Sequence, residues 1–202
     1  MLRNVQEIRI PAGDFSVTAS VHGKGSTAVV LGHGAGGDRS TGMLVDLAET
    51  LADSGRQAVL YNFPYSDHGR RAPDPPDVLE RTARAVGDFA RSSLGAGKVV
   101  LGGKSMGGRI ASQAVAKGAP AEGLVFLGYP LHPPGRTRIR RDRHLPDIAA
   151  PMLFVQGTRD CLRALGLARG ARGAALAARD PSPRRRRRPL LRRAEALRPH
   201  TG

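Results

Sequence analysis

Short apolar runs alternate with amphipathic stretches over the first 160 residues of the chain. VQEIRI and FSVTASVH alternate apolar and polar residues with a period of two and are separated by PAGD, which predicts a β-hairpin. The segment TAVVLGHG (27–34) contains a continuous apolar run, as expected of a strand that is buried on both faces of a sheet. Further strands are predicted at residues 57–63, 98–103, 123–130 and 151–157.

Three stretches between these strands carry apolar residues at helical spacing, at residues 41–54, 78–94 and 106–117. In the second stretch, Val86 and Phe89 belong to one apolar stripe. Because strands and helices alternate, the sequence predicts an α/β fold with a mostly parallel sheet and helices on both faces.

Residues 161–202 differ in kind from the part before them. Ala, Arg, Gly and Pro occupy 29 of these 42 positions, and RRRRR stands at 184–188. We therefore divide the chain into a domain at 1–160 and an Arg/Ala-rich tail at 161–202 that is disordered or loosely helical. The same composition arises when a GC-rich gene is read out of frame, so a frame-shifted tail is the alternative.

The net charge of +15 belongs largely to this tail rather than to the domain. The tail holds twelve of the 32 basic residues against two acids, Asp180 and Glu195, which gives it +10. Nucleic-acid binding is therefore expected only non-specifically, through the tail, if at all.

Cellular location is predicted from two further features of the sequence. No apolar run approaches the roughly 20 residues of a membrane span, so we expect no membrane partner. The single cysteine, Cys161, fits a reducing cytoplasm. No cofactor and no metal site is predicted.

GGKSMGG (102–108) is open to two interpretations. A phosphate-binding loop needs a glycine five residues before Gly103, where Lys98 stands, and a predicted strand fills the interval. A nucleophile elbow needs a serine between glycines on a turn from a strand into a helix, which Gly103, Ser105 and Gly107 provide. We predict Ser105 as a catalytic nucleophile; a plain glycine-rich turn is the alternative.

GHGAGG (32–37) matches the dinucleotide-binding pattern, but the next strand ends in Asn62 and Phe63 rather than in the required acid. The alternative is a loop that supplies an oxyanion-hole amide, with the second amide on Met106, which follows the nucleophile. We name Ala35 as the loop donor, with Gly34 or Gly36 as substitutes. His33 belongs to this loop. Asp160 follows the strand at 151–156 and is predicted as the catalytic acid.

Seven segments together resemble one family. They are GHGAGGD (32–38), YNFPY (61–65), GRRAPD (69–74), GGKSMGGR (102–109), LGYPLHPPG (127–135), HLP (144–146) and VQGTRD (155–160). The family is the α/β-hydrolase-like group of testis-expressed and NSL-complex-subunit proteins, which is related to dienelactone hydrolases. The resemblance covers roughly residues 5–160. It implies an α/β-hydrolase fold with Ser105 as nucleophile and Asp160 as triad acid, no defined substrate, and scaffold roles in some relatives.

The chain departs from that family after residue 160, where members continue with a helix, a final strand and a catalytic histidine. His200 is in the right order, but no predicted strand precedes it, and the other histidines lie too early in the chain: His22, His33, His68, His132 and His144. We therefore expect a C-terminally incomplete fold whose strand at 151–156 is an exposed edge. The predicted function is hydrolysis of ester or acyl substrates, impaired by the missing histidine. The alternatives are a non-catalytic interaction protein and a nucleic-acid binder acting through the basic tail.

Two arginine-containing segments could contact partners. Arg70 and Arg71 follow a strand on the side where α/β sites open, so they either bind an anionic substrate or form salt bridges in a solvated loop. RTRIRRDR (136–143) is either a solvated loop or a contact for acidic partners or nucleic acid. No aromatic residue interrupts it, so base stacking is not indicated.

Overall fold

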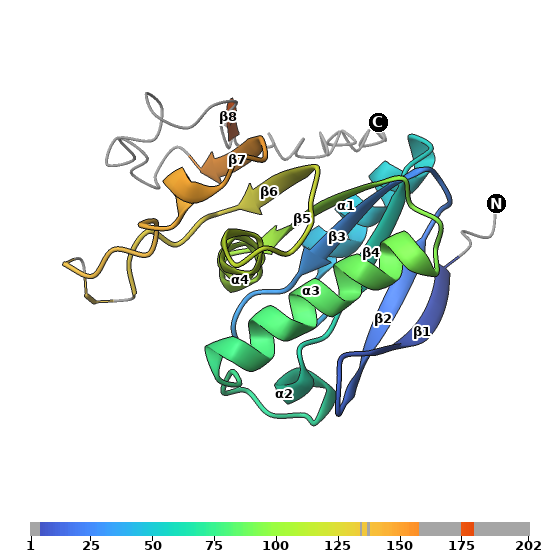
Figure 1. The fold of residues 1–202 in the computed structure, drawn as a ribbon, viewed down its shortest axis with the longest axis horizontal. Coiled ribbons are helices and arrows are strands. Elements are labelled where there is room, and N and C mark those ends of the chain that lie inside the picture. The colour runs from blue at the N-terminus through green and yellow to red at the C-terminus, as the bar shows by residue number, and fades with distance from the viewer. Residues whose placement is uncertain (1–4, 134, 137, 158–174, 180–202) are drawn as a thin grey trace, which may run out of the picture.

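The computed structural model of the chain describes residues 5–133, 135–136, 138–157 and 175–179, the last five by their backbone alone. Its centre is an eight-stranded sheet in the order β1-β2-β4-β3-β5-β6-β7-β8 (Figure 1). β1 pairs antiparallel with β2 and β2 pairs antiparallel with β4, whereas all later pairs are parallel. The strands are β1 (Val5–Pro11), β2 (Ser16–His22), β3 (Thr27–Gly32), β4 (Gln57–Tyr61), β5 (Lys98–Lys104), β6 (Gly123–Leu127), β7 (Met152–Gly157) and β8 (Ala175–Arg179).

Helices cover both faces of the sheet, as Figure 1 shows, with α3 and α4 on one face and α1 on the other. The bounds are α1 (Gly42–Asp53), α2 (Pro64–Asp67), α3 (Pro76–Ser92), α4 (Met106–Ala116) and the short 3-10 helix η1 (Leu145–Asp147). The predicted fold class and the three long helices are confirmed. α2 is a single turn that the apolar pattern did not predict.

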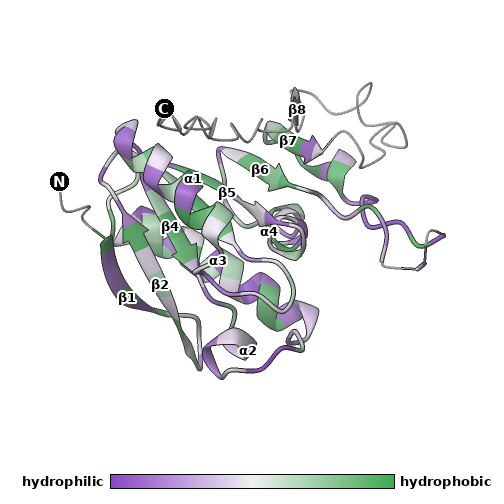
Figure 2. Ribbon diagram, turned by 180° about the vertical axis from the view of Figure 1, so that it is seen from behind, coloured by the Kyte–Doolittle hydropathy of each residue, from purple (hydrophilic) through white to green (hydrophobic). Residues whose placement is uncertain are grey.

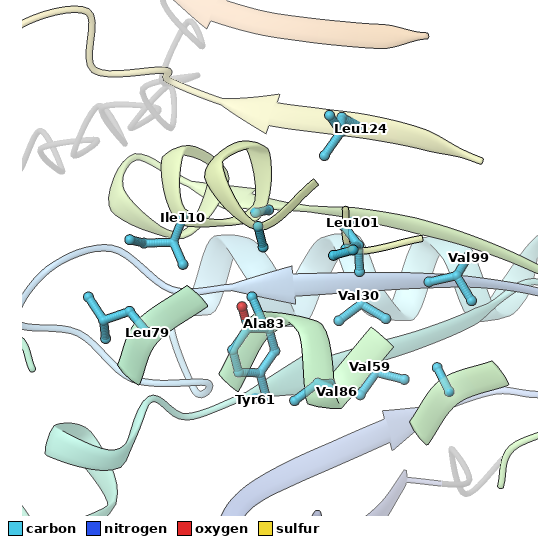
Figure 3. Close-up of a cluster of buried hydrophobic side chains, with 14 of the residues drawn as sticks. Val30, Val59, Tyr61, Leu79, Ala83, Val86, Val99, Leu101, Ile110 and Leu124 are labelled. Atoms are coloured by element: carbon cyan, nitrogen blue, oxygen red, sulfur yellow. The ribbon is translucent and has the colours of Figure 1, made fainter. Parts of the chain in front are cut away.

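The sheet alternates its side chains between two hydrophobic layers. Val30 and Leu101 pack with α3 and α4 in the larger layer (Figure 3), whereas Leu31 packs with Leu44 of α1 in the smaller one. All but the first residue of β3 are buried, which agrees with the continuous apolar run. The outermost strand β1 is mostly exposed and carries hydrophilic residues (Figure 2).

The expectation that residues 151–156 form an exposed edge is wrong. β8 lies beside β7 in parallel register, from Leu153 opposite Ala175 to Gly157 opposite Arg179. Residues 175–179 therefore form a strand and are neither disordered nor helical, while the boundary at residue 160 stays a prediction. The segment ALAAR has no β-branched or aromatic residue, so its pattern did not predict a strand. Main-chain pairing at the edge of a sheet does not require such residues.

Candidate active site

Ser105 lies between the last residue of β5 and the first residue of α4, in a backbone conformation that serine rarely adopts. Its φ is 50° and its ψ is −107°, and among the described residues no other non-glycine has a positive φ. Such a conformation costs on the order of 1–3 kcal/mol and persists only where the surrounding structure enforces it. The Ser105 amide donates to the Leu127 carbonyl at 3.0 Å, and its own carbonyl accepts from the Arg109 amide at 3.2 Å.

Glycines permit this turn because β3 and β5 approach α4 without room for side chains. A Cβ atom added to Gly103 or to Gly107 would lie 2.1 Å from the Gly32 carbonyl oxygen, and Gly103 also has a φ of 147°. The strand–glycine–serine–glycine–helix order predicted from the sequence is therefore present. Because residues 98–104 form a strand, the segment is not a phosphate-binding loop of the G-x-x-x-x-G-K type.

The loop between β3 and α1 lies directly beside Ser105. A Cβ atom added to Gly34 would be 3.9 Å from the Ser105 Cβ atom and 3.7 Å from the Lys104 carbonyl oxygen. α1 begins only at Gly42, so the glycines of GHGAGG do not open a helix as a dinucleotide-binding site requires.

The amides of this loop differ in whether they already have an acceptor. The Gly36 amide donates to the Tyr65 hydroxyl at 3.2 Å, and the Gly37 amide donates to the Gly34 carbonyl at 3.1 Å. The amides of Ala35 and Gly34 have no acceptor within the described part of the chain, and neither has that of Met106. The structure therefore leaves Ala35 and Gly34 as possible loop donors and removes Gly36, which was named as a substitute.

His33 is fully buried, and both of its ring nitrogens are occupied. The Phe63 amide donates to Nε2 at 3.2 Å, so Nδ1 carries the proton and donates to the Gly34 carbonyl at 2.8 Å. Burial lowers the pKa of His33, and the aromatic rings of Phe63 and Tyr65 pack against it edge-on. His33 therefore holds the loop in place and offers neither a free nitrogen nor an exposed surface to a substrate.

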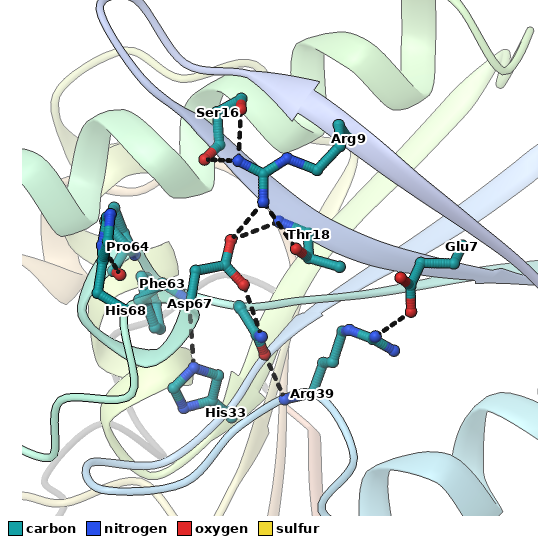
Figure 4. Close-up of polar contacts among 11 residues, drawn as sticks. Glu7, Arg9, Ser16, Thr18, His33, Arg39, Phe63, Pro64, Asp67 and His68 are labelled. Carbon is teal, nitrogen blue, oxygen red and sulfur yellow. Dashed lines mark hydrogen bonds and ion pairs between the residues drawn. The ribbon is translucent and has the colours of Figure 1, made fainter.

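A polar network that was not predicted from the sequence holds the end of the β3–α1 loop at Arg39 (Figure 4). The Arg39 amide donates to Asn62 Oδ1 at 2.7 Å, and Asn62 Nδ2 donates to Asp67 Oδ1 at 2.8 Å. Asp67 Oδ2 accepts from the Thr18 amide at 2.7 Å and from Arg9 at 3.2 Å. The signal available beforehand was a polar residue, Asn62, directly after a buried strand. Its partners come from segments far apart in the sequence.

The segment with Arg70 and Arg71, which was predicted to contact substrate, follows α2 and approaches the β3–α1 loop. Asp74 accepts from the Tyr65 amide at 2.7 Å and from Arg70 at 2.6 Å, so Arg70 forms a salt bridge with it. Arg71 is exposed, and its carbonyl oxygen lies 4.0 Å from a Cβ atom added to Gly36. The structure thus separates the two arginines: Arg70 is paired, whereas Arg71 lies beside the loop without an acid at ion-pair distance in the described residues.

None of the described histidines bonds to Ser105. His144 Nε2 lies 2.8 Å from Ser112 Oγ, and burial together with the positive charge of Arg109 lowers the pKa of His144. His22 bonds to the Ser20 hydroxyl, His68 to the Pro64 carbonyl and His132 to the Ile139 carbonyl. The predicted acid, Asp160, and His200 both lie outside the described residues.

Comparison with known proteins decides the family. A profile described as the alpha/beta hydrolase domain matches residues 25–173, most of the chain. This chain is a member of the alpha/beta hydrolase family. The family match therefore extends beyond residue 160, where the sequence predicted the domain to end.

Solved structures of other hydrolases have the same fold. A dienelactone hydrolase from Anabaena variabilis is 18% identical with a TM-score of 0.69, covering 89% of this chain and 88% of that one. An alpha-beta serine hydrolase homologue from Coxiella burnetii is 16% identical with a TM-score of 0.71, covering 86% of each chain. A serine hydrolase without a lid from Xanthomonas campestris is 17% identical with a TM-score of 0.68, covering 87% and 84%. At these identities the likeness shows the fold alone.

In the part of this alpha/beta hydrolase that the structure describes, no helix combines the length and the apolar character needed to cross a membrane.

Proposed function

We propose that this alpha/beta hydrolase is a serine hydrolase of ester or acyl substrates with Ser105 as its nucleophile, and that its turnover is low. The observation that carries the proposal is the strained backbone of Ser105 at the turn from β5 into α4. Strain of this kind concentrates at functional sites, and a nucleophile elbow uses it to expose the serine hydroxyl. The family membership and the serine hydrolases among the structural neighbours support the same chemistry.

In the proposed reaction Ser105 Oγ attacks the substrate carbonyl carbon, and the hydroxyl proton passes to a base. The tetrahedral oxyanion accepts hydrogen bonds from the amides of Met106 and Ala35, both of which lack another acceptor in the described residues. The bond to the leaving group then breaks, the leaving group takes up the proton from that base and departs as an alcohol, and an acyl-serine remains. Water hydrolyses this ester, releases the acid and restores the Ser105 hydroxyl. Asp160 is proposed as the acid that would orient a catalytic base.

Turnover is low in this proposal because no described histidine bonds to Ser105 and could take its proton directly. A serine hydroxyl is a weak nucleophile until its proton is removed. When one member of a triad is missing, the oxyanion hole and substrate binding still leave about 10³–10⁴-fold catalysis over water. The expected enzyme is therefore slow but measurable.

A fluorophosphonate probe, which phosphonylates activated serines with loss of fluoride, tests this proposal. We expect Ser105 to be labelled over hours, with no labelling in Ser105→Ala. Ser92→Ala removes an exposed hydroxyl at the end of α3 and is the matched control that keeps the labelling. Circular dichroism checks that each variant is folded before labelling is compared. If the folded wild-type protein is not labelled, Ser105 is not a nucleophile.

The lack of a bond from any described histidine to Ser105 favours one second candidate, a non-catalytic interaction protein on the same scaffold. Membership in the testis-expressed and NSL-complex-subunit group, some of whose members have scaffold roles, belongs to this candidate and stays a proposal, as does a cytoplasmic location. Titration with an acidic partner at several salt concentrations distinguishes it: saturable binding that does not weaken with salt supports it, and steep salt dependence indicates contact through the basic tail.

A further inference from the structure

Two exposed cationic residues lie next to the loop beside Ser105, Lys104 near Gly34 and Arg71 near Gly36. Lys104 directly precedes Ser105, and its side-chain Cδ lies 4.0 Å from a Cβ atom added to Gly34. The backbone carbonyl oxygen of Arg71 lies 4.0 Å from a Cβ atom added to Gly36, two residues further along the same loop. The Tyr65 hydroxyl contacts both Gly34 and Gly36, so the loop positions next to Lys104 and to the Arg71 backbone are held relative to each other.

Neither cation has an acid at ion-pair distance among the residues that the structure describes, although other arginines nearby do. Arg70 pairs with Asp74 at 2.6 Å and Arg9 with Asp67 at 3.2 Å, and Arg39 pairs with Glu7. Lys104 and Arg71 are both exposed. Their charges are therefore available to a molecule that enters the site.

The acids of this region are already engaged with other groups. The Asp38 carboxylate accepts from the Ser40 amide at 2.7 Å and from the Ser40 hydroxyl at 2.5 Å. Asp74 is held by the Tyr65 amide and by Arg70. A surface that places unpaired cations around a reaction centre raises the local concentration of anionic ligands.

We propose that Lys104 and Arg71 bind an anionic group on the substrate, so that the site prefers ester or acyl compounds carrying a carboxylate or phosphate over neutral ones. Lys104 binds close to the reacting carbonyl because its stem lies against Gly34 and the chain continues directly into Ser105. Arg71 contributes its charge from the segment after α2, whose backbone lies beside Gly36 of the same loop. This inference rests on the proposed hydrolase function and adds the substrate class to it.

The test compares 4-nitrophenyl hydrogen glutarate with 4-nitrophenyl butyrate, an anionic and a neutral ester. The measured quantity is the ratio of kcat/KM for the two esters. We expect the wild-type ratio to favour the anion, and Lys104→Gln and Arg71→Gln each to reduce the ratio by about threefold to tenfold. The ratio should also fall as ionic strength rises, because salt screens exposed charges.

Lys98→Gln is the matched control. Lys98 is exposed and lies on the same strand as Lys104 but at the opposite end of it, so its removal changes the net charge by the same amount away from the site. The ratio should stay at the wild-type value. A ratio that changes equally in Lys98→Gln and Lys104→Gln would mean that only overall charge matters, which would overturn the inference.

Competition against fluorophosphonate labelling gives the same comparison without turnover. Monomethyl glutarate should slow the labelling of Ser105 at lower concentration than methyl pentanoate, and inorganic phosphate shows whether the site accepts that anion as well. If Ser105 is labelled but the anionic and neutral competitors act equally, the substrate class is wrong and the hydrolase function stands. If Ser105 in the folded protein is never labelled, both fail together.

Discussion

At the scale of the residue, Ser105 and His33 show how the site depends on groups held away from their ordinary states. Ser105 has a φ of 50° and a ψ of −107°, and His33 is fully buried with one nitrogen accepting and the other donating. The strain at Ser105 costs free energy that the surrounding contacts must offset, whereas the two hydrogen bonds of His33 offset the cost of burying its ring. Their common effect is to bring the Gly34 backbone next to the serine side chain.

The strain at Ser105 predicts that Ser105→Gly stabilises the protein. Glycine adopts a positive φ without steric cost, so we expect a gain of about 1 kcal/mol, or a rise in Tm of about 2–4 °C, together with complete loss of labelling. Thermal unfolding followed by circular dichroism measures the change.

Ser92→Gly is the control for glycine as such. Ser92 is an ordinary exposed residue at the end of α3, where glycine should lower stability by up to about 1 kcal/mol. If both glycine variants lose stability to the same extent, then Ser105 is not strained.

At the scale of the element, the close approach of β3, β5 and the first turn of α4 creates the turn. Gly32 is the common contact, because its carbonyl oxygen would clash with a Cβ atom on Gly103 and on Gly107. The β3–α1 loop is then tied to the segment after β4 by the Asn62–Asp67 network and by the His33–Phe63 bond. The site is therefore held by packing between elements and does not depend on one segment alone.

Gly107→Ala should separate α4 from β3. The added methyl group would lie 2.1 Å from the Gly32 carbonyl oxygen, which is backbone and cannot rotate away. We expect a loss of about 3 kcal/mol or more, since overpacking against backbone is costly. Urea unfolding measures the loss.

Gly42→Ala provides the comparison for this variant. Gly42 opens α1 with nothing within 4 Å of the added Cβ, so stability should be unchanged or slightly higher. Equal stability in the two alanine variants would contradict the close contact.

At the scale of the whole molecule, the basic C-terminal part contributes a strand of the sheet as well as positive charge. β8 comes from it and pairs with β7, so the sheet extends to residue 179. The charge and the strand therefore call for separate experiments. The nucleotide sequence from codon 158 onward tests whether the tail is read out of frame.

Replacing Arg184–Arg188 with serine should abolish most non-specific nucleic-acid binding while leaving the sheet unchanged. Each lost phosphate contact reduces the slope of log K against log salt by about 0.9 for duplex DNA, so five arginines account for up to about 4–5. Salt-dependent binding to a random duplex measures the slope.

A truncation after residue 160 is the informative contrast for this substitution. It removes the charge and also β8, which exposes the edge of β7 and should promote aggregation. If the serine variant binds DNA as tightly as the wild type, the contact lies elsewhere, and the basic segment 136–143 is then the first place to look.

The sequence by itself determined the kinds of elements, their order and the turn that holds Ser105. Apolar periodicity reports which side of a segment is hidden from water, and the glycines around Ser105 report a local steric need, so both can be read without knowing the neighbours. Tertiary structure alone decided that His33 supports the loop, that Arg70 is paired while Arg71 has no acid at ion-pair distance among the described residues, that Gly36 is no longer a free donor, and that residues 175–179 add a strand. These outcomes depend on hydrogen bonds and charges between segments distant in sequence, and such partners exist only once the chain has folded.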